Sequence, residues 1–237
     1  MADITELKRQ AAWRAVEFIR SGMVVGLGHG STTAFAIERL ADLLRTSTLQ
    51  HILCIPCSEE VAQHATRLGI PLTTLNDHRT IDLTIDGADE VDAEMNLIKG
   101  GGGALLREKI VASASQREMI IVDSSKLSSH LGVRFALPVE VIPFACAVEA
   151  EAIESLGAHV LRRGGDDPFL TDQRNYILDC DFGSIDQPAM LAAQLDARPG
   201  VVAHGLFVNL ATDLVVATKR GVQHYSRGSD LSQAISG

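Results

Sequence analysis

The chain has 237 residues, of which 46% are hydrophobic and 22% are charged. This composition is typical of a globular protein with an apolar core and excludes a disordered chain. The net charge of −9 argues against nucleic acid or an anionic membrane as the main partner. Because no segment has the roughly 20 apolar residues that span a bilayer and the N-terminus lacks an apolar signal segment, we expect a soluble, cytoplasmic protein.

The first half of the chain alternates short apolar runs with segments of helical periodicity. The apolar runs predict strands at residues 23–25, 52–55, 81–86 and 119–122. The helical periodicity predicts helices at 5–20, from a Ser31 cap onward, from a Ser58 cap to Gly69, and at 104–115. Strands that alternate with helices indicate an α/β domain with a Rossmann-like, mostly parallel sheet.

The pattern changes after Leu131. Strands are predicted at 137–142, 159–161 and 176–181, and helices at 148–156 and 189–195. We interpret residues 132–204 as a second, smaller α+β domain. Strands at 205–209 and 214–218 are expected to return to the first sheet, so residues 1–131 and 205–237 would form the α/β catalytic domain.

The first candidate site is the loop Gly28-His29-Gly30-Ser31-Thr32, between a predicted strand and a predicted helix. A helix N-terminus offers unpaired N–H groups and the positive end of the helix dipole, and glycine lets a phosphate approach the backbone. A tight turn with a helix cap is the simpler alternative. The glycine spacing does not complete the G-x-G-x-x-G pattern of dinucleotide-binding loops.

The second candidate is a pair of acidic residues after the strand at 81–86. Asp86 ends that strand, where α/β sheets bind their ligands, and Asp89 lies one tight turn beyond. An acidic surface turn is the alternative interpretation.

The third candidate begins at Lys99, which precedes four consecutive glycines (100–103) and a predicted helix. Because such a run costs much backbone entropy, it favours a site for an anionic ligand over a flexible linker. Glu108 shares the small apolar face of the following helix. Burial there would raise its pKa and make it a base near neutral pH; a salt bridge to Arg107 or Lys109 is the alternative.

The cysteines and histidines predict neither a metal centre nor a redox centre. Cys54 and Cys57 form a C-x-x-C pair, but Cys146 and Cys180 are isolated, and the eight histidines lack ligand spacing.

Taken together, these segments resemble the type A ribose-5-phosphate isomerase family over nearly the whole chain. The order and spacing of the motifs match along with the residues themselves. The segments that carry the resemblance are residues 26–32, 86–90, 97–103, 107–109, 122–126 and 137–143. One departure is His29, where the family usually has threonine. The family fold, an α/β domain with a small ferredoxin-like domain, agrees with the pattern above.

The resemblance implies interconversion of D-ribose 5-phosphate and D-ribulose 5-phosphate through a cis-enediol, a step of the non-oxidative pentose phosphate pathway, with no metal or organic cofactor. Asp86 would assist ring opening and Glu108 would move the proton. Lys99 would stabilise the oxyanion, and Asp89 would hold sugar hydroxyls. The other implied substrate contacts are His29, Gly30, Ser31, Thr32, Gly87, Ala88, Gly100, Gly101, Gly102, Lys126 and Lys8.

The family also suggests a homodimer or homotetramer that acts on a small sugar phosphate and binds neither nucleic acid nor membrane. Two other functions stay open at this point. An acyl-CoA-transferase-like enzyme could share the architecture but would need a nucleotide-sized pocket. A sugar-phosphate-sensing effector domain normally follows a DNA-binding helix-turn-helix, whereas one helix precedes the first strand here.

Overall fold

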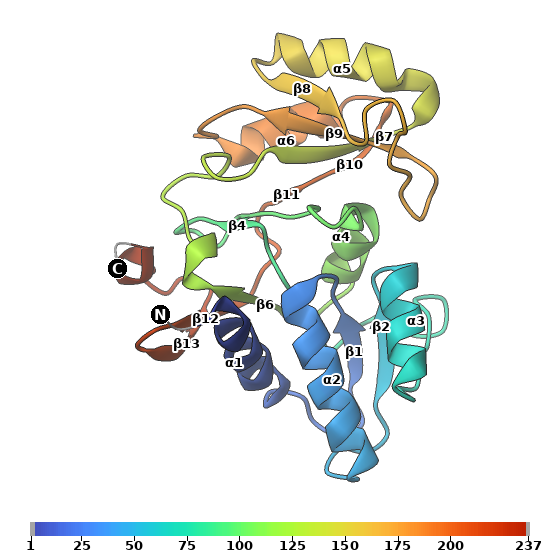
Figure 1. Ribbon diagram of the computed structural model, residues 1–237, viewed down its shortest axis with the longest axis vertical. Coiled ribbons are helices and arrows are strands. Elements are labelled where there is room, and N and C mark those ends of the chain that lie inside the picture. The colour runs from blue at the N-terminus through green and yellow to red at the C-terminus, as the bar shows by residue number, and fades with distance from the viewer. Residues whose placement is uncertain (1–2, 236–237) are drawn as a thin grey trace.

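The computed structural model describes residues 3–235, whose largest sheet has six strands in the order β13-β12-β6-β3-β1-β2 (Figure 1). All neighbours in it are parallel except the β12–β13 hairpin. Its strands are β1 Val24–Leu27, β2 Leu53–Pro56, β3 Leu83–Asp86, β6 Glu118–Asp123, β12 Asp213–Thr218 and β13 Gly221–Ser226. The sheet confirms the predicted α/β class, and the chain reverses its direction of winding between β1 and β3.

Helices cover both faces of this sheet. They are α1 Ile4–Val16, α2 Ser31–Arg45, α3 Glu59–Arg67 and α4 Leu105–Ser113. Buried residues of α1 and α2 pack against Met119 and Ile121 of β6, whereas Ala112 of α4 shares a cluster with Ile120 and Val122. The alternation along β6 therefore divides its side chains between the two helix layers.

A second sheet is antiparallel, with the strand order β10-β7-β9-β8. Its elements follow the chain as β7 Leu137–Val141, α5 Cys146–Ser155, β8 His159–Arg162, β9 Tyr176–Asp181, α6 Pro188–Asp196 and β10 Val201–His204. This is the ferredoxin-like β-α-β-β-α-β arrangement. Strand β10 is absent from the sequence prediction.

A third, three-stranded sheet joins the other two. It contains β4 Glu90–Val91, β5 Leu97–Ile98 and β11 Leu206–Phe207, in the order β11-β5-β4. The prediction that residues 205–209 return to the first sheet is therefore wrong. Leu206 and Phe207 are buried against β5, and only the next strand, β12, enters the large sheet. The remaining elements are the short helix α7, Ser232–Ile235, and two 3₁₀ turns at Ser124–Lys126 and Pro143–Ala145.

Two local predictions also need correction. Helix α1 ends at Val16 instead of residue 20, because the N–H groups of Phe18 and Ile19 bond to carbonyls three residues back and close the helix. Ser31 is the first residue of α2, and Gly30 occupies the cap with φ +119°, a backbone angle that favours glycine. The Ser58 cap is confirmed, since its hydroxyl accepts from the Val61 N–H.

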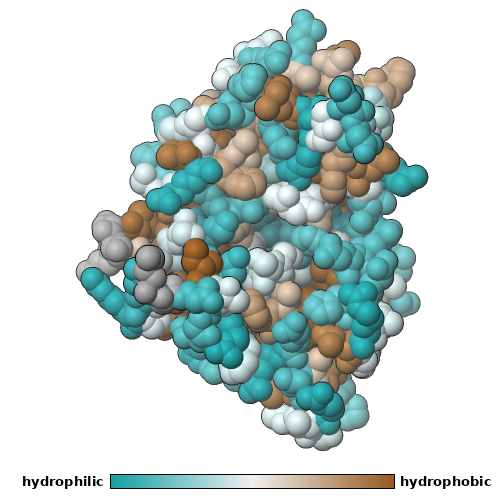
Figure 2. Space-filling model, viewed as in Figure 1, coloured by the Kyte–Doolittle hydropathy of each residue, from teal (hydrophilic) through white to brown (hydrophobic). Residues whose placement is uncertain are grey.

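The face of the molecule shown in Figure 2 is predominantly hydrophilic, with hydrophobic residues scattered over it. Several large hydrophobic side chains of the second-sheet region are exposed, among them Phe144 at 98% and Val148 at 63%. Within the described part of the chain, no helix combines the length and apolar character needed to cross a membrane.

Candidate active site

The carboxyl ends of β1 and β3 meet where the winding reverses, which is where open α/β sheets bind ligands. The two strands are parallel with Leu27 opposite Ile85, so the loop after β1 lies against Asp86. A side chain at Gly28 would place its Cβ 2.1 Å from Asp86 Oδ1, so only glycine permits this approach. Asp86 Oδ1 also accepts the N–H groups of His29 (3.1 Å) and Gly87 (2.7 Å).

Lys99 lies between the two central carboxylates. Its Nζ is 3.0 Å from Asp86 Oδ2 and 3.1 Å from Glu108 Oε1, and it donates to Gly87 O at 2.6 Å. All three side chains are buried: Lys99 is 2% exposed, Asp86 1% and Glu108 4%. Glu108 thus forms a salt bridge, but not with Arg107 or Lys109 as the alternative interpretation expected. Its partner is Lys99, which directly follows β5.

Burial and charge shift the pKa values of this cluster. Burial raises the pKa of Glu108 to about 8, although the Lys99 ammonium opposes the shift. Burial alone lowers the pKa of Lys99, but the carboxylates of Asp86 and Glu108 raise it well above its ordinary value. Glu108 Oε2 has no hydrogen-bond partner among the described residues. The cluster therefore combines a permanent cation with a carboxyl group that can gain or lose a proton near neutral pH.

The glycine run folds tightly around this cluster. Gly100 and Gly103 have φ values of +104° and +83°, which favour glycine. The Gly101 N–H donates to Asp89 Oδ2 at 2.7 Å, so Asp89 holds the run in place. A Cβ on Gly102 would lie 2.4 Å from the His29 ring. Steric and backbone demands at these positions explain why the run contains no larger residue.

These segments enclose a pocket with a volume of about 150 Å³. The residues that line it are Lys8, His29, Gly30, Ser31, Thr32, Gly87, Ala88, Asp89, Lys99, Gly100, Gly101, Gly102, Glu108 and Lys126. The structure thus brings together every site residue predicted from the sequence; all of them line the pocket except Asp86, which is buried next to Lys99.

Basic groups gather at the α2 end of the pocket. Lys8 on α1 donates to Ser31 Oγ at 2.9 Å, and Ser31 begins α2, where unpaired N–H groups favour an anion. The His29 ring turns toward α3, with Nδ1 3.1 Å from Ser58 Oγ and Nε2 3.9 Å from Glu60. This end of the pocket offers the donors that a phosphate requires.

The second-sheet region contributes residues that the sequence analysis missed. Arg163, directly after β8, donates through Nη1 to Gly100 O (3.0 Å) and Gly101 O (3.2 Å), and its Nε donates to Asp179 (3.0 Å). A Cβ on Gly103 would meet the Phe169 ring at 2.4 Å. Arg163 could not be assigned to the site from the sequence, since no local pattern links it to a glycine run over sixty positions away.

Comparisons of the sequence and of the structure with known proteins both identify one family. Residues 53–221 match the family of ribose 5-phosphate isomerase A (phosphoriboisomerase A). Ribose-5-phosphate isomerase A of Chloroflexus aurantiacus is 57% identical over 220 residues, which is 92% of each chain. The structure of ribose 5-phosphate isomerase from Plasmodium falciparum is 39% identical with a TM-score of 0.91, and the match covers 95% of this chain and all (100%) of that one. This chain is therefore a member of the ribose 5-phosphate isomerase A family.

Proposed function

We propose that this pocket interconverts D-ribose 5-phosphate and D-ribulose 5-phosphate, with Glu108 as the base that moves the proton. Family membership supports the reaction. The observation that carries the role of Glu108 is its geometry. Its buried carboxyl lies in the pocket wall, one oxygen pairs with Lys99, and the other has no partner among residues 3–235. A base in this position with a raised pKa suits proton transfer near neutral pH.

The proton transfer needs no external reactant. In the open-chain aldose, Glu108 removes the proton from C2, the C–H electron pair forms the C1–C2 double bond, and the carbonyl electron pair moves onto O1 as the oxyanion of an enediol. A proton passes from O2 to O1, and return of the Glu108 proton to C1 as the C2 carbonyl forms yields the ketose. Such a base contributes about 10²–10⁴-fold to the rate. We assign to the developing oxyanion the Lys99 ammonium and the N–H groups of the glycine run other than those of Gly101 and Gly103, which already donate to Asp89 and to Gly100 O. Preorganised donors of this kind supply the larger share of the rate enhancement.

Ring opening precedes this step, and we assign it to Asp86. Its Oδ1 accepts two backbone N–H groups and its Oδ2 pairs with Lys99. For proton exchange with the sugar ring, Oδ2 has to turn from Lys99 toward the substrate. Asp89, which lines the pocket and holds Gly101, is assigned to the sugar hydroxyls.

The phosphate is assigned to the α2 end of the pocket, where Lys8, Ser31 and Thr32 lie, with Lys126 as a further contact. A solved ribose-5-phosphate isomerase that is 37% identical to this chain, with a TM-score of 0.93, is in complex with phospho-erythronic acid. That ligand joins a phosphate to a polyhydroxy acid, which supports a site with separate regions for phosphate and oxyanion.

The two alternative functions receive less support. The pocket volume of about 150 Å³ is smaller than the roughly 300 Å³ at which sites for drug-sized ligands begin, which favours a small sugar phosphate over a coenzyme A nucleotide. The relatives named above are isomerases, which favours turnover over sensing.

We further propose that the protein acts in the cytoplasm, in the pentose phosphate pathway, and as a homo-oligomer. The exposed hydrophobic side chains of Phe144 and Val148 support association.

The first experiment measures conversion of ribose 5-phosphate in the presence of excess chelator. We expect the parent protein to turn over, and the Glu108→Gln variant to lose about two decades or more of kcat while it still binds the substrate. Glu154→Gln, an exposed change on α5, is the matched control and should retain the parent rate. Binding without turnover by the parent would favour the sensor, and turnover that chelation abolishes would contradict the metal-free mechanism.

A further inference from the structure

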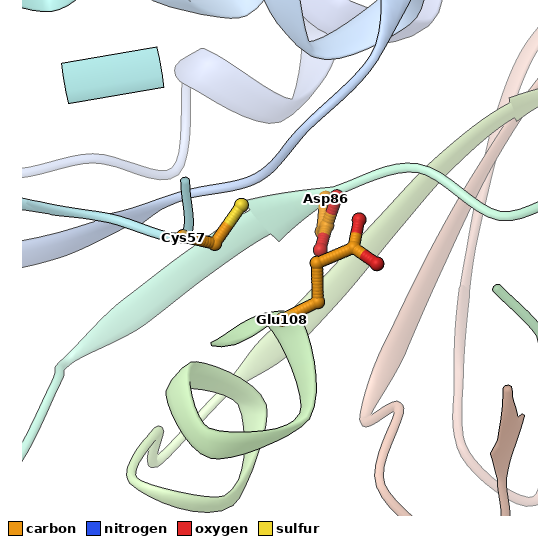
Figure 3. A group of neighbouring side chains, drawn as sticks. All are labelled: Cys57, Asp86 and Glu108. Carbon is orange, nitrogen blue, oxygen red and sulfur yellow. The ribbon is translucent and has the colours of Figure 1, made fainter. Parts of the chain in front are cut away.

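Cys57 adds a thiol to the two central carboxylates. The residue follows β2 and is 0% exposed. Its Sγ, one carboxylate oxygen of Asp86 and one of Glu108 all lie within 4.8 Å of one another (Figure 3). The three side chains come from the ends of β2 and β3 and from α4, so only the tertiary fold brings them together.

Glu108 leaves one coordination position open in this group. Its Oε2 is buried and accepts no hydrogen bond from the described residues. A buried acceptor without a donor is costly, and a bound cation would satisfy it. Asp86 is already bonded through both oxygens, but each carboxylate oxygen has a second lone pair that a cation can use.

The donor set indicates the class of cation. One sulfur and two carboxylate oxygens suit Zn²⁺ or Cd²⁺, whereas Mg²⁺ and Ca²⁺ prefer all-oxygen sites. The Lys99 ammonium, 3.1 Å from Glu108 Oε1, repels any ion that enters, so a strong metal–sulfur bond is needed to offset the repulsion. A thiolate and two carboxylates beside one ammonium leave two negative charges, which a divalent ion neutralises.

We propose that Cys57, Asp86 and Glu108 form an inhibitory site for a thiophilic divalent cation. The ion enters through the substrate pocket, because Glu108 lines that pocket. Cys57 does not line it, so the ion passes Glu108 before it reaches the thiol. It forms a bond to Cys57 Sγ as the thiol proton leaves to solvent, and Glu108 releases its own proton to solvent when it binds the ion as a carboxylate. No group is oxidised or reduced. Coordination of Glu108 removes the base from the reaction. Inhibition therefore rests on the proposed function, whereas binding of the ion does not.

Cd²⁺ is the probe, because a cadmium–thiolate bond produces charge-transfer absorption in the ultraviolet. The variants are Cys57→Ser and, as the matched control, Cys54→Ser, which removes the other buried thiol of the C-x-x-C pair. We expect the same absorption in the parent and in Cys54→Ser, and a smaller absorption in Cys57→Ser, where any remainder comes from the half-buried Cys146 thiol. Relative to each protein's own uninhibited rate, the Cd²⁺ concentration for half inhibition should rise at least about tenfold in Cys57→Ser. A chelator should restore the rate.

Equal inhibition of Cys57→Ser and parent would overturn the proposal, as would a parent that shows no absorption at saturating Cd²⁺. If Cys57→Ser does not fold, judged by circular dichroism, Cys57→Ala replaces it in the same titration. A parent without isomerase activity would contradict the proposed function, while the absorption titration would still decide the cation site.

Discussion

At the residue scale, the site depends on the placement of one lysine between two carboxylates. Lys99 holds Asp86 and Glu108 at 3.0 and 3.1 Å in a buried environment, where charges interact strongly and unpaired ones are costly. One oxygen of Glu108 has no hydrogen-bond partner in the described part of the chain, and burial raises the pKa of this carboxyl to about 8. The same burial that makes this carboxyl a suitable base makes it sensitive to pH.

The first residue-scale prediction concerns pH. Because a protonated Glu108 cannot accept a proton, kcat/KM should be low below the pKa of about 8, rise through it and level off above it. The measurement is initial rate against pH at substrate concentrations far below KM. A profile that is flat across that pKa would show that ionisation of Glu108 does not control the reaction.

The second residue-scale prediction is a loss of stability in Lys99→Met. The substitution leaves Asp86 and Glu108 without their cation, and loss of one partner from a buried ion pair typically costs about 3–5 kcal/mol. Urea denaturation measures the change in the free energy of unfolding, and turnover should be lost as well. Lys126→Met, at a half-buried position of the same pocket, is the control and should change stability by less than about 1 kcal/mol. Similar stabilities for the two variants would contradict the buried pair.

At the element scale, the segment between β8 and β9 connects the second sheet to the glycine run. Arg163 donates to two successive carbonyls of the run, Gly100 O and Gly101 O, and pairs with Asp179 on β9. Each of these carbonyls shares a rigid peptide group with the next N–H group of the run. By holding the carbonyls, Arg163 therefore also fixes the directions of those N–H groups in the loop that lines the pocket. The second, antiparallel sheet thereby contributes to the geometry of the site, although its role here is to hold the glycine run and not to contact the substrate.

The prediction at this scale is that Arg163→Met lowers kcat/KM by about tenfold. A loss of this size corresponds to the energy of about one hydrogen bond from a charged group. Arg163→Lys retains a donor and should recover part of the loss, which a purely structural role would not predict. Arg162→Met is the matched control, since Arg162 faces Tyr176 and Gly165 and should retain the parent kinetics. Equal kinetics in Arg163→Met and Arg162→Met would contradict the positioning role.

At the scale of the whole molecule, the pocket lies beside the junction of the three sheets. Lys99 follows β5 of the linking sheet, and its N–H donates to Gly205 O just after β10 of the antiparallel sheet. Asp86 ends a strand of the large sheet. The site therefore forms only when both larger sheets are folded and packed, and its geometry depends on how they are held together.

The prediction at this scale is association through the exposed side of the second-sheet region, where Phe144 is 98% exposed. We expect a homo-oligomer in sedimentation velocity, and a lower association state or weaker association for Phe144→Ser. Leu68→Ser, a change of a half-exposed leucine after α3, is the control and should sediment as the parent does. A monomeric parent, or identical sedimentation of all three proteins, would contradict the prediction.

The α/β class, most elements to within a few residues, and the segments of the pocket could all be predicted from the amino-acid sequence. These features depend on local signals: the Ser58 cap, apolar periodicity, and the glycines at 100–103. The loop after β1 and the Asp86 segment could be assigned to one site because the carboxyl ends of neighbouring parallel strands meet at one edge of a sheet.

The contacts between side chains, by contrast, depend on the three-dimensional fold. The cation beside Glu108 is Lys99, nine residues upstream on another element, instead of its sequence neighbours Arg107 or Lys109. Strand β11 pairs with β5, outside the large sheet, and Arg163 reaches the glycine run from the second sheet. Periodicity and capping report on a residue's immediate neighbours along the chain. Contacts between distant segments depend on how the sheets pack, and no local pattern encodes that packing.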